Sequence, residues 1–312
     1  MKAANTLSCL LAAAGLFSAQ GLRCQDAAVA SVHPIRVREI LAPAGVQKQL
    51  EPSGLVLFNN QLLIVSDEKD VTDVYQLTPR DDQTLQAEPF LSLPAELGQE
   101  SSDLEGITFC GKQIYVVDEA TSTVVEIRSD GEALVHSLKL STAQSSGDDA
   151  RASESAGVGM EGIACDDAAD ILYLAWERQP RMIYAVDLSS FRFLDAFDVP
   201  VGWQSPRSEG GKMVYADFAD LYFEDGFLYA LQRSDRTILK IAPREKRLVS
   251  KLRLDFEESL YYEYNEPFGM AEGLFITSDR IYIVLDNNGT ARIGNPQNTS
   301  PLLLEFARPA GF

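Results

Sequence analysis

Five places in the sequence, at nearly constant spacing, carry residues that together could bind a cation. The reference residues, separated by 52, 56, 58 and 53 positions, are Gly54, Gly106, Gly162, Asp220 and Gly273. The residues directly before them are Ser53, Glu105, Glu161, Ala219 and Glu272. Three carboxylates brought close together cannot all stay ionised unless they share protons or a cation neutralises them. An all-oxygen set without histidine or cysteine suits a hard cation. Ca²⁺ is the best match, with water or backbone carbonyls completing its coordination.

A repeated strand pattern explains how positions so far apart in sequence could meet. In each of five units, a short strand follows the reference residue, then a turn rich in Asn, Asp and Gly, a strongly apolar second strand and an alternating third strand. Fourth strands such as "AEPFLSL" and "FRFLDAFDV" close most units. Alternating β-branched and aromatic residues, interrupted by turns about every ten positions, indicate all-β structure. Radially repeated four-stranded sheets form a β-propeller.

We therefore predict a single β-propeller domain over residues 36–312, with five blades. Six blades are the alternative if the long connections contain a divergent blade, and a β-sandwich is the other all-β alternative, although sandwiches do not repeat in this way. The last unit lacks a fourth strand after "PLLLEFARP". The early segment "IRVREILAP" is expected to supply that strand and close the ring.

The propeller geometry predicts that the inner set converges on one face. The first strand of each blade lines the central axis and the second runs antiparallel beside it, so the start of one and the end of the other lie together. The glycine after each inner residue lets neighbouring backbones approach closely around the axis. The fourth unit departs from the pattern because Ala219 offers no ligand, although Asp217 or Asp220 could compensate. The structural alternative for the glutamates is cross-blade hydrogen bonding in a packed channel.

An outer set is expected at the ends of the second strands on the same face. Its members are Glu68, Glu119, Glu177, Arg233 and Asp286, with Arg178 beside Glu177. Two arginines next to a metal could hold a phosphate or carboxylate. Glu119 and Glu177 are the candidates for activating a water molecule. Ordinary surface ion pairs are the alternative interpretation of these strand-end charges.

The overall charge narrows the classes of partner. The chain has 312 residues, with 27 Lys or Arg against 46 Asp or Glu, for a net charge of -19. Such a charge argues against nucleic acid or an anionic membrane surface as partner. It is compatible with a cation bound among carboxylates, although a solvated acidic surface has the same composition. With only two histidines, His33 and His136, there is little material for a Ser–His or Cys–His catalytic pair.

The N-terminus has the features of an export signal. Lys2 precedes the apolar run "LLAAAGLFSA" and the small residues "AQG", so we expect cleavage after Gly21 and a leader over residues 22–35. A lipoprotein site at Cys24 is the alternative. The apolar run is too short for a membrane span, and no later segment is long and apolar enough. These features predict a periplasmic or secreted protein.

Cleavage would leave three cysteines, Cys24, Cys110 and Cys165. An odd number without metal-type spacing is not a disulfide framework. Cys110 and Cys165 lie late in equivalent strands, so they could pair, but two buried free thiols are the favoured interpretation.

Several segments carry a resemblance to known exported propellers. "EPSGLVL…LLIVSDE", "DLEGITF…IYVVDE", "GMEGIACDDAADILYLAWER" and "MAEGLFI" resemble the SdiA-regulated family, and they are similar to the related family described as having esterase-like activity of phytase. The resemblance covers about residues 35–310 and implies a β-propeller fold. The order of inner residues also looks like that of the calcium-dependent apyrases. That likeness implies Ser53, Glu105, Glu161 and Glu272 as Ca²⁺ ligands, with Ala219 where a serine is expected.

Two functions follow as expectations. The first is an exported calcium-binding propeller that binds a small anionic ligand at its central funnel and could hydrolyse a phosphoester or ester with help from the metal. The second is a non-enzymatic propeller with a structural metal, whose loops on that face bind a protein or a glycan. The absence of a nucleophile–histidine pair favours binding over catalysis.

Overall fold

The structure is a computed structural model, and it describes residues 30–45, 49–68, 71–93, 102–129, 131–138, 159–177, 181–199, 207–209, 212–214, 216–264 and 268–312. The predicted signal peptide, Cys24 and Arg178 lie outside these ranges. The described part is all-β, with two short 3-10 turns, η4 (Arg233–Asp235) and η5 (Glu258–Leu260). It contains no helix of the length and apolarity that a membrane span requires.

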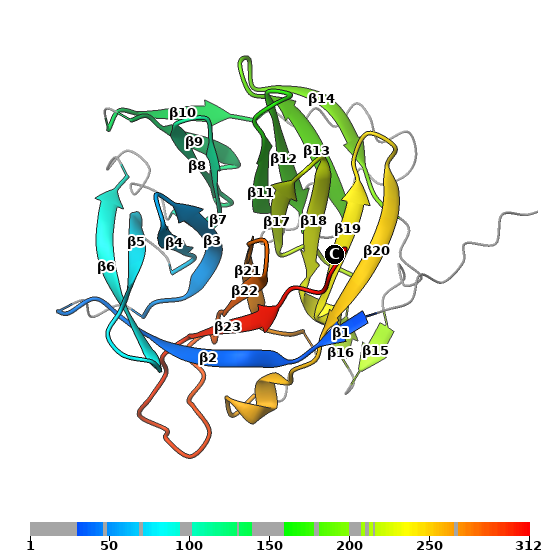
Figure 1. Cartoon of the computed structure of the whole chain (residues 1–312). Coiled ribbons are helices and arrows are strands. Elements are labelled where there is room, and N and C mark those ends of the chain that lie inside the picture. Colours follow the sequence, from blue (N-terminus) through cyan, green and yellow to red (C-terminus); the bar gives the residue numbers. More distant parts are fainter. Residues whose placement is uncertain are drawn as a thin grey trace, which may run out of the picture.

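The strands form four-stranded antiparallel sheets arranged around a centre, so the predicted β-propeller fold is confirmed (Figure 1). Blade one contains β3 (Pro52–Phe58), β4 (Gln61–Ser66), β5 (Asp73–Pro79) and β6 (Thr84–Ser92). Blade two contains β7 (Leu104–Cys110), β8 (Gln113–Asp118), β9 (Thr123–Ile127) and β10 (Ala133–Ser137). Blade three contains β11 (Met160–Asp166), β12 (Ile171–Trp176), β13 (Met182–Asp187) and β14 (Arg192–Phe197).

The remaining strands form two further blades and a hairpin. Blade four contains β17 (Asp220–Glu224), β18 (Phe227–Gln232), β19 (Thr237–Ala242) and β20 (Arg247–Leu254). Blade five contains β21 (Ala271–Ile276), β22 (Arg280–Leu285), β23 (Leu302–Ala307) and β2 (Pro34–Leu41). The hairpin pairs β15 (Arg207–Glu209) with β16 (Lys212–Val214). Five blades are present in the described residues. The count for the whole chain stays a prediction, because residues 139–158 and 200–206 are outside the described ranges.

The ring is closed by the N-terminal strand, as the sequence predicts. Strand β2 pairs antiparallel with β23 and supplies the missing fourth strand of blade five. It also pairs in parallel with β6 of blade one, so blades one and five share one eight-stranded sheet. Strand β1 (Ala30–Val32), within the range expected as a leader, adds to blade four by pairing in parallel with β20.

The core lies between the blades. Each buried apolar cluster of the described residues contains side chains from two neighbouring blades, as with Val65 of blade one and Val116 of blade two. The first strands β3, β7, β11, β17 and β21 contact one another in turn around the axis. Tight turns follow them where Asn, Asp and Gly can adopt positive φ, as at Asn59 and Asn60, with φ of 48° and 67°. This arrangement brings the starts of all first strands together.

Candidate metal and ligand site

The inner residues lie at a structural irregularity that four blades share. In β3, β7, β11 and β21 the pairing with the second strand shifts by one residue across the Ser–Gly or Glu–Gly pair. In blade two, for example, Leu104 pairs with Asp118 and Ile107 with Val116. Such β-bulges bend a strand and change the direction of the side chains that it presents. Blade four has no shift, because Asp220 pairs with Leu231 and Leu221 with Ala230.

The glycines allow the close approach that the sequence predicts around the axis. A Cβ atom on Gly106 would lie 2.6 Å from the Glu161 carbonyl oxygen, and one on Gly54 would lie 2.8 Å from the Glu105 carbonyl oxygen. Real Cβ atoms do not tolerate such distances, so these positions need glycine.

Asp220 takes a different role where the other blades have glycine. Its Oδ2 accepts a hydrogen bond from the Leu274 amide of blade five at 2.7 Å, and its Oδ1 accepts one from the Leu221 amide at 2.8 Å. The Ile163 amide of blade three also donates to it. Burial raises the pKa of Asp220 well above its usual value, and these amide donors oppose the shift. The Asp220 carboxylate therefore links three blades.

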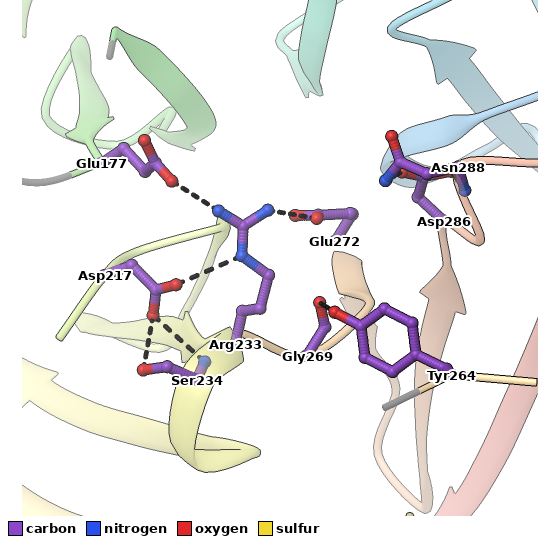
Figure 2. Close-up of polar contacts among 9 residues, drawn as sticks. All are labelled: Glu177, Asp217, Arg233, Ser234, Tyr264, Gly269, Glu272, Asp286 and Asn288. Carbon is purple, nitrogen blue, oxygen red and sulfur yellow. Dashed lines mark hydrogen bonds and ion pairs between the residues drawn. The ribbon is translucent and has the colours of Figure 1, made fainter. Parts of the chain in front are cut away.

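Arg233 is the centre of an ion-pair cluster that joins blades three, four and five (Figure 2). Its Nη2 donates to Glu177 at 2.5 Å, its Nε to Asp217 at 3.2 Å, and its Nη1 to Glu272. Burial alone would lower the pKa of Arg233, but the carboxylates of Glu272, Asp217 and Glu177 raise it well above its ordinary value. We call these four residues the arginine sector.

A second group of carboxylates lies in blade two. One carboxylate oxygen from each of Asp103, Glu105 and Glu119 lies within 4.8 Å of the others. The Glu105 residue is only 8% exposed. Burial raises the pKa of its carboxyl group well above the usual value, and the nearby charges of Glu161, Asp67, Glu119 and Asp103 raise it further. We call Asp103, Glu105 and Glu119 the acidic triad.

Further carboxylates extend the acidic region into blades one and five. Burial, followed by the charge of Asp286, raises the pKa of Asp67 to about 9. Burial also raises the pKa of Asp286 to about 7, although the Asn288 amide donates to it at 2.9 Å. Oδ1 of Asp67 is buried and has no hydrogen-bond partner within the described residues. Glu68 follows Asp67, and its charge helps to raise the pKa of Glu51.

The structure brings some predicted site residues together and separates others. Glu177 and Glu272, expected in two different roles, each form an ion pair with Arg233, which was expected in a third. Ser53 Oγ donates to the Leu104 carbonyl oxygen of blade two at 2.5 Å. Glu161 lies close to the arginine sector and to the acidic triad. Burial raises the pKa of its carboxyl group most, the charges of Glu177 and Glu119 raise it further, and Arg233 lowers it. Whether these residues bind metal stays a prediction.

Sequence reasoning considered Asp217 but missed that it belongs to a third recurring acidic position. Glu51, Asp103 and Asp217 each lie three residues before their reference residue, in blades one, two and four. The same alignment that identified the inner set contains this signal. Asp103 joins the acidic triad and Asp217 joins the arginine sector.

The preference for free thiols is wrong, because Cys110 and Cys165 form a disulfide with a Cα–Cα distance of 5.7 Å. Cys110 ends β7 and Cys165 lies near the end of β11, and these are adjacent first strands. The two adjacent first strands bring these cysteines close enough for the bond, which connects blades two and three.

Comparison with known proteins identifies a family and supports the fold. The family described as SdiA-regulated matches residues 93–288, more than half of the chain. No curated protein matches the sequence. The solved structure of Myxococcus xanthus glutaminyl cyclase is similar, with 13% sequence identity and a TM-score of 0.53 over 90% of this chain and 100% of that one. Virginiamycin B lyase from Staphylococcus aureus is 11% identical, with a TM-score of 0.43 over 83% of this chain and 66% of that one. At 13% identity the likeness to glutaminyl cyclase concerns the fold alone.

Proposed function

This chain belongs to the SdiA-regulated family, and we propose that it is an exported β-propeller that binds calcium in its central funnel and holds a small anionic ligand through the bound ion. The signal-like N-terminus supports export to the periplasm or the medium. The burial of so many carboxylates at one end of the first strands supports the cation.

The observation that carries this proposal is the charge of the funnel. Glu105, Glu161 and Asp286 are buried and Asp67 is half-buried, and nearby carboxylates raise the pKa of each. A cation would allow these groups to ionise at neutral pH without mutual repulsion. The donors are carboxylate oxygens, which calcium prefers, so the residues fit the ion.

The anionic ligand would depend on the ion rather than on Arg233. The guanidinium donors of Arg233 already contact three carboxylates. Bound calcium would supply positive charge to a phosphate or carboxylate oxygen of the ligand, since calcium keeps coordination positions for water or ligand oxygens. Glu177 accepts a hydrogen bond from Arg233, and the sequence offers little material for a nucleophile–histidine pair, so ligand binding is the proposed activity rather than hydrolysis.

Metal analysis and calorimetric titration of the purified mature protein with Ca²⁺ test the proposal. We expect one Ca²⁺ per chain, and we expect binding to be lost when Glu105→Gln and Glu161→Gln are combined. Glu88→Gln, on the exposed outer strand β6, is the matched control and should bind like the wild type. Absence of Ca²⁺ binding by the wild type would refute the proposal.

A panel of phosphoesters and carboxylesters, with and without chelator, then tests the ligand. Binding of an anionic compound that chelator abolishes is the expected result. Chelator-sensitive release of product would extend the activity to hydrolysis. Ligand binding that persists in chelator and in the double variant would place the ligand elsewhere. N-terminal sequencing of the exported protein should find Leu22 at the start.

A further inference from the structure

We infer that the Cys110–Cys165 disulfide regulates the calcium site, so that the oxidised chain binds Ca²⁺ more tightly than the reduced chain. This inference rests on the proposed function and names a regulation of its site. The bond joins the two first strands that carry Glu105 and Glu161, two of the proposed ligands.

Each of these two strands carries a glutamate at one end and a cysteine at the other. In β7, Glu105 is the second residue and Cys110 is the last. In β11, Glu161 is the second residue and Cys165 is the second to last. At about 3.3 Å per residue, each cysteine lies about 13–17 Å along the strand from its glutamate. The disulfide and the proposed ligands are therefore at opposite ends of one pair of strands.

The two strands are held to each other differently from strands within a blade. β7 and β11 belong to separate four-stranded sheets, and each is hydrogen-bonded to the second strand of its own blade. They contact each other by packing around the axis. Within the described residues, Cys110–Cys165 is the one disulfide that crosses between blades. The bond therefore limits how far β7 and β11 can slide or separate.

The packing between the strands can carry a displacement from the disulfide to the ligands. A Cβ atom on Gly106 would lie 2.6 Å from the Glu161 carbonyl oxygen and 3.0 Å from the Ile163 amide nitrogen, so the two backbones are in close contact beside the ligands. Cys110 and Ile163 belong to one buried cluster between the blades. Interiors packed this closely transmit strain. Breaking the bond should therefore change the separation of Glu105 and Glu161, on which shared coordination of one ion depends.

The two cysteines differ in exposure, which gives a reductant one sulfur to attack. Cys110 is 1% exposed, whereas Cys165 is only partly buried. A thiolate of a small dithiol would attack the Cys165 sulfur, and the Cys110 sulfur would leave. The second thiol of the reductant then resolves the mixed disulfide, so two electrons and two protons pass to the protein and the reductant becomes a cyclic disulfide. Asp167 Oδ1 lies 3.8 Å from Cys110 Sγ and is placed to accept a hydrogen bond from the resulting thiol.

Export gives this coupling a direction. Disulfides form and persist outside the cytoplasm, whereas cytosolic thiols are kept reduced. The chain would therefore reach its high-affinity form only after export, in the compartment where the proposed function places it.

The test is Ca²⁺ titration of the full mature chain by calorimetry, oxidised and after reduction with excess dithiothreitol, with circular dichroism to check folding. We expect reduction to weaken Ca²⁺ binding about 5-fold or more, the lower end of typical coupling between two sites. Cys110→Ala combined with Cys165→Ala should bind Ca²⁺ like the reduced wild type, with or without dithiothreitol, which controls for effects of the reductant itself. If the alanine pair does not fold, the reduced wild type, which keeps both sulfur atoms, carries the test alone.

A second measurement links the effect to the ligands. Because coupling between binding equilibria is reciprocal, Ca²⁺ should make the wild-type disulfide harder to reduce by the same factor. Redox titration against dithiothreitol, with and without Ca²⁺, measures this protection. The protection should disappear when Glu105→Gln and Glu161→Gln are combined.

Several results would overturn the inference. Equal Ca²⁺ affinity of the oxidised and reduced wild type would do so and would leave the proposed function standing. Unfolding of the chain on reduction would also do so, because the bond would then maintain the whole fold rather than one site. If neither form binds Ca²⁺, the proposed function fails, and the inference fails with it.

Discussion

The funnel contains two acidic sectors that balance their charge in different ways. In the arginine sector, three carboxylates from blades three, four and five surround one guanidinium. In the acidic triad and its neighbours, carboxylates from blades one and two face one another, and no Lys or Arg of the described residues pairs with Glu105. The difference originates in blade four, which has Ala219 at the inner position and Arg233 at the outer one.

The arginine sector has its cation built into the fold, whereas the proposed function gives the carboxylates around Glu105 a cation from solution. A buried ion pair contributes little net stability, but removing one partner leaves an uncompensated charge. The arginine sector should therefore be sensitive to loss of its cation residue. Under the proposed function, the stability that Glu105 and its neighbours confer should depend on Ca²⁺ and on pH.

Arg233→Met should cause the largest change, because it leaves Glu177, Asp217 and Glu272 buried without their shared partner. We expect a loss of about 3–5 kcal/mol in the free energy of unfolding. Urea unfolding in calcium-free buffer measures it. Arg233→Lys keeps the positive charge but loses the forked donors, so its free energy of unfolding should lie between those of the wild type and the Met variant. A Met variant as stable as the wild type would show that the sector does not depend on Arg233.

The pH dependence of calcium-free protein should be the next largest effect. The pKa of Asp67 is raised to about 9 and that of Asp286 to about 7, so between about pH 4 and these values the folded state binds more protons than the unfolded state. Stability should therefore fall as pH rises from 5.5 to 7.5, by at most about 1.4 kcal/mol per pH unit for each group. Unfolding at several pH values, with and without Ca²⁺, measures this. A slope of the opposite sign in chelator would contradict the expectation.

Glu105→Gln should have the reverse effect of Arg233→Met. In calcium-free buffer at pH 7.5 it should raise stability by about 1 kcal/mol, because folding would no longer bury an ionisable group whose pKa is raised by burial and by like-charged neighbours. In excess Ca²⁺ the wild type should regain the advantage, since an ion that binds only the folded state stabilises it. Thermal unfolding in both buffers measures the crossover. Destabilisation of the variant in chelator would indicate that Glu105 has a partner that the proposed site does not include.

Ser53→Ala should have the smallest effect. It removes one hydrogen bond to the Leu104 carbonyl oxygen, which is worth about 1 kcal/mol, from a position outside both sectors. Ca²⁺ affinity should change little. A large loss of affinity would return Ser53 to the ligand set that the sequence predicts.

The sequence alone determined the architecture. Regularly spaced glycines and alternating strands predicted the blades, and the missing fourth strand of the last unit predicted that "IRVREILAP" would close the ring as β2. The close contacts at Gly54 and Gly106 also follow from the sequence pattern. These features could be predicted because strand period and turn residues are properties of short stretches of sequence. Each blade is encoded by one such stretch, and the propeller repeats that unit around its axis.

The partners of the side chains were decided only by the tertiary structure. Arg233 contacts Glu177 and Glu272, which lie 56 and 39 residues away in sequence, and Cys110 bonds to Cys165 across two blades. The pattern placed Glu272 and Arg233 on one face but could not show that the long guanidinium reaches across the funnel. The charge balance at the centre depends on the residues of every blade. Blade four has Ala219 at the inner position and Arg233 at the outer one, and this difference affects the surroundings of every carboxylate there. Such a balance depends on distances between side chains of different blades, and those distances exist only once the ring has closed.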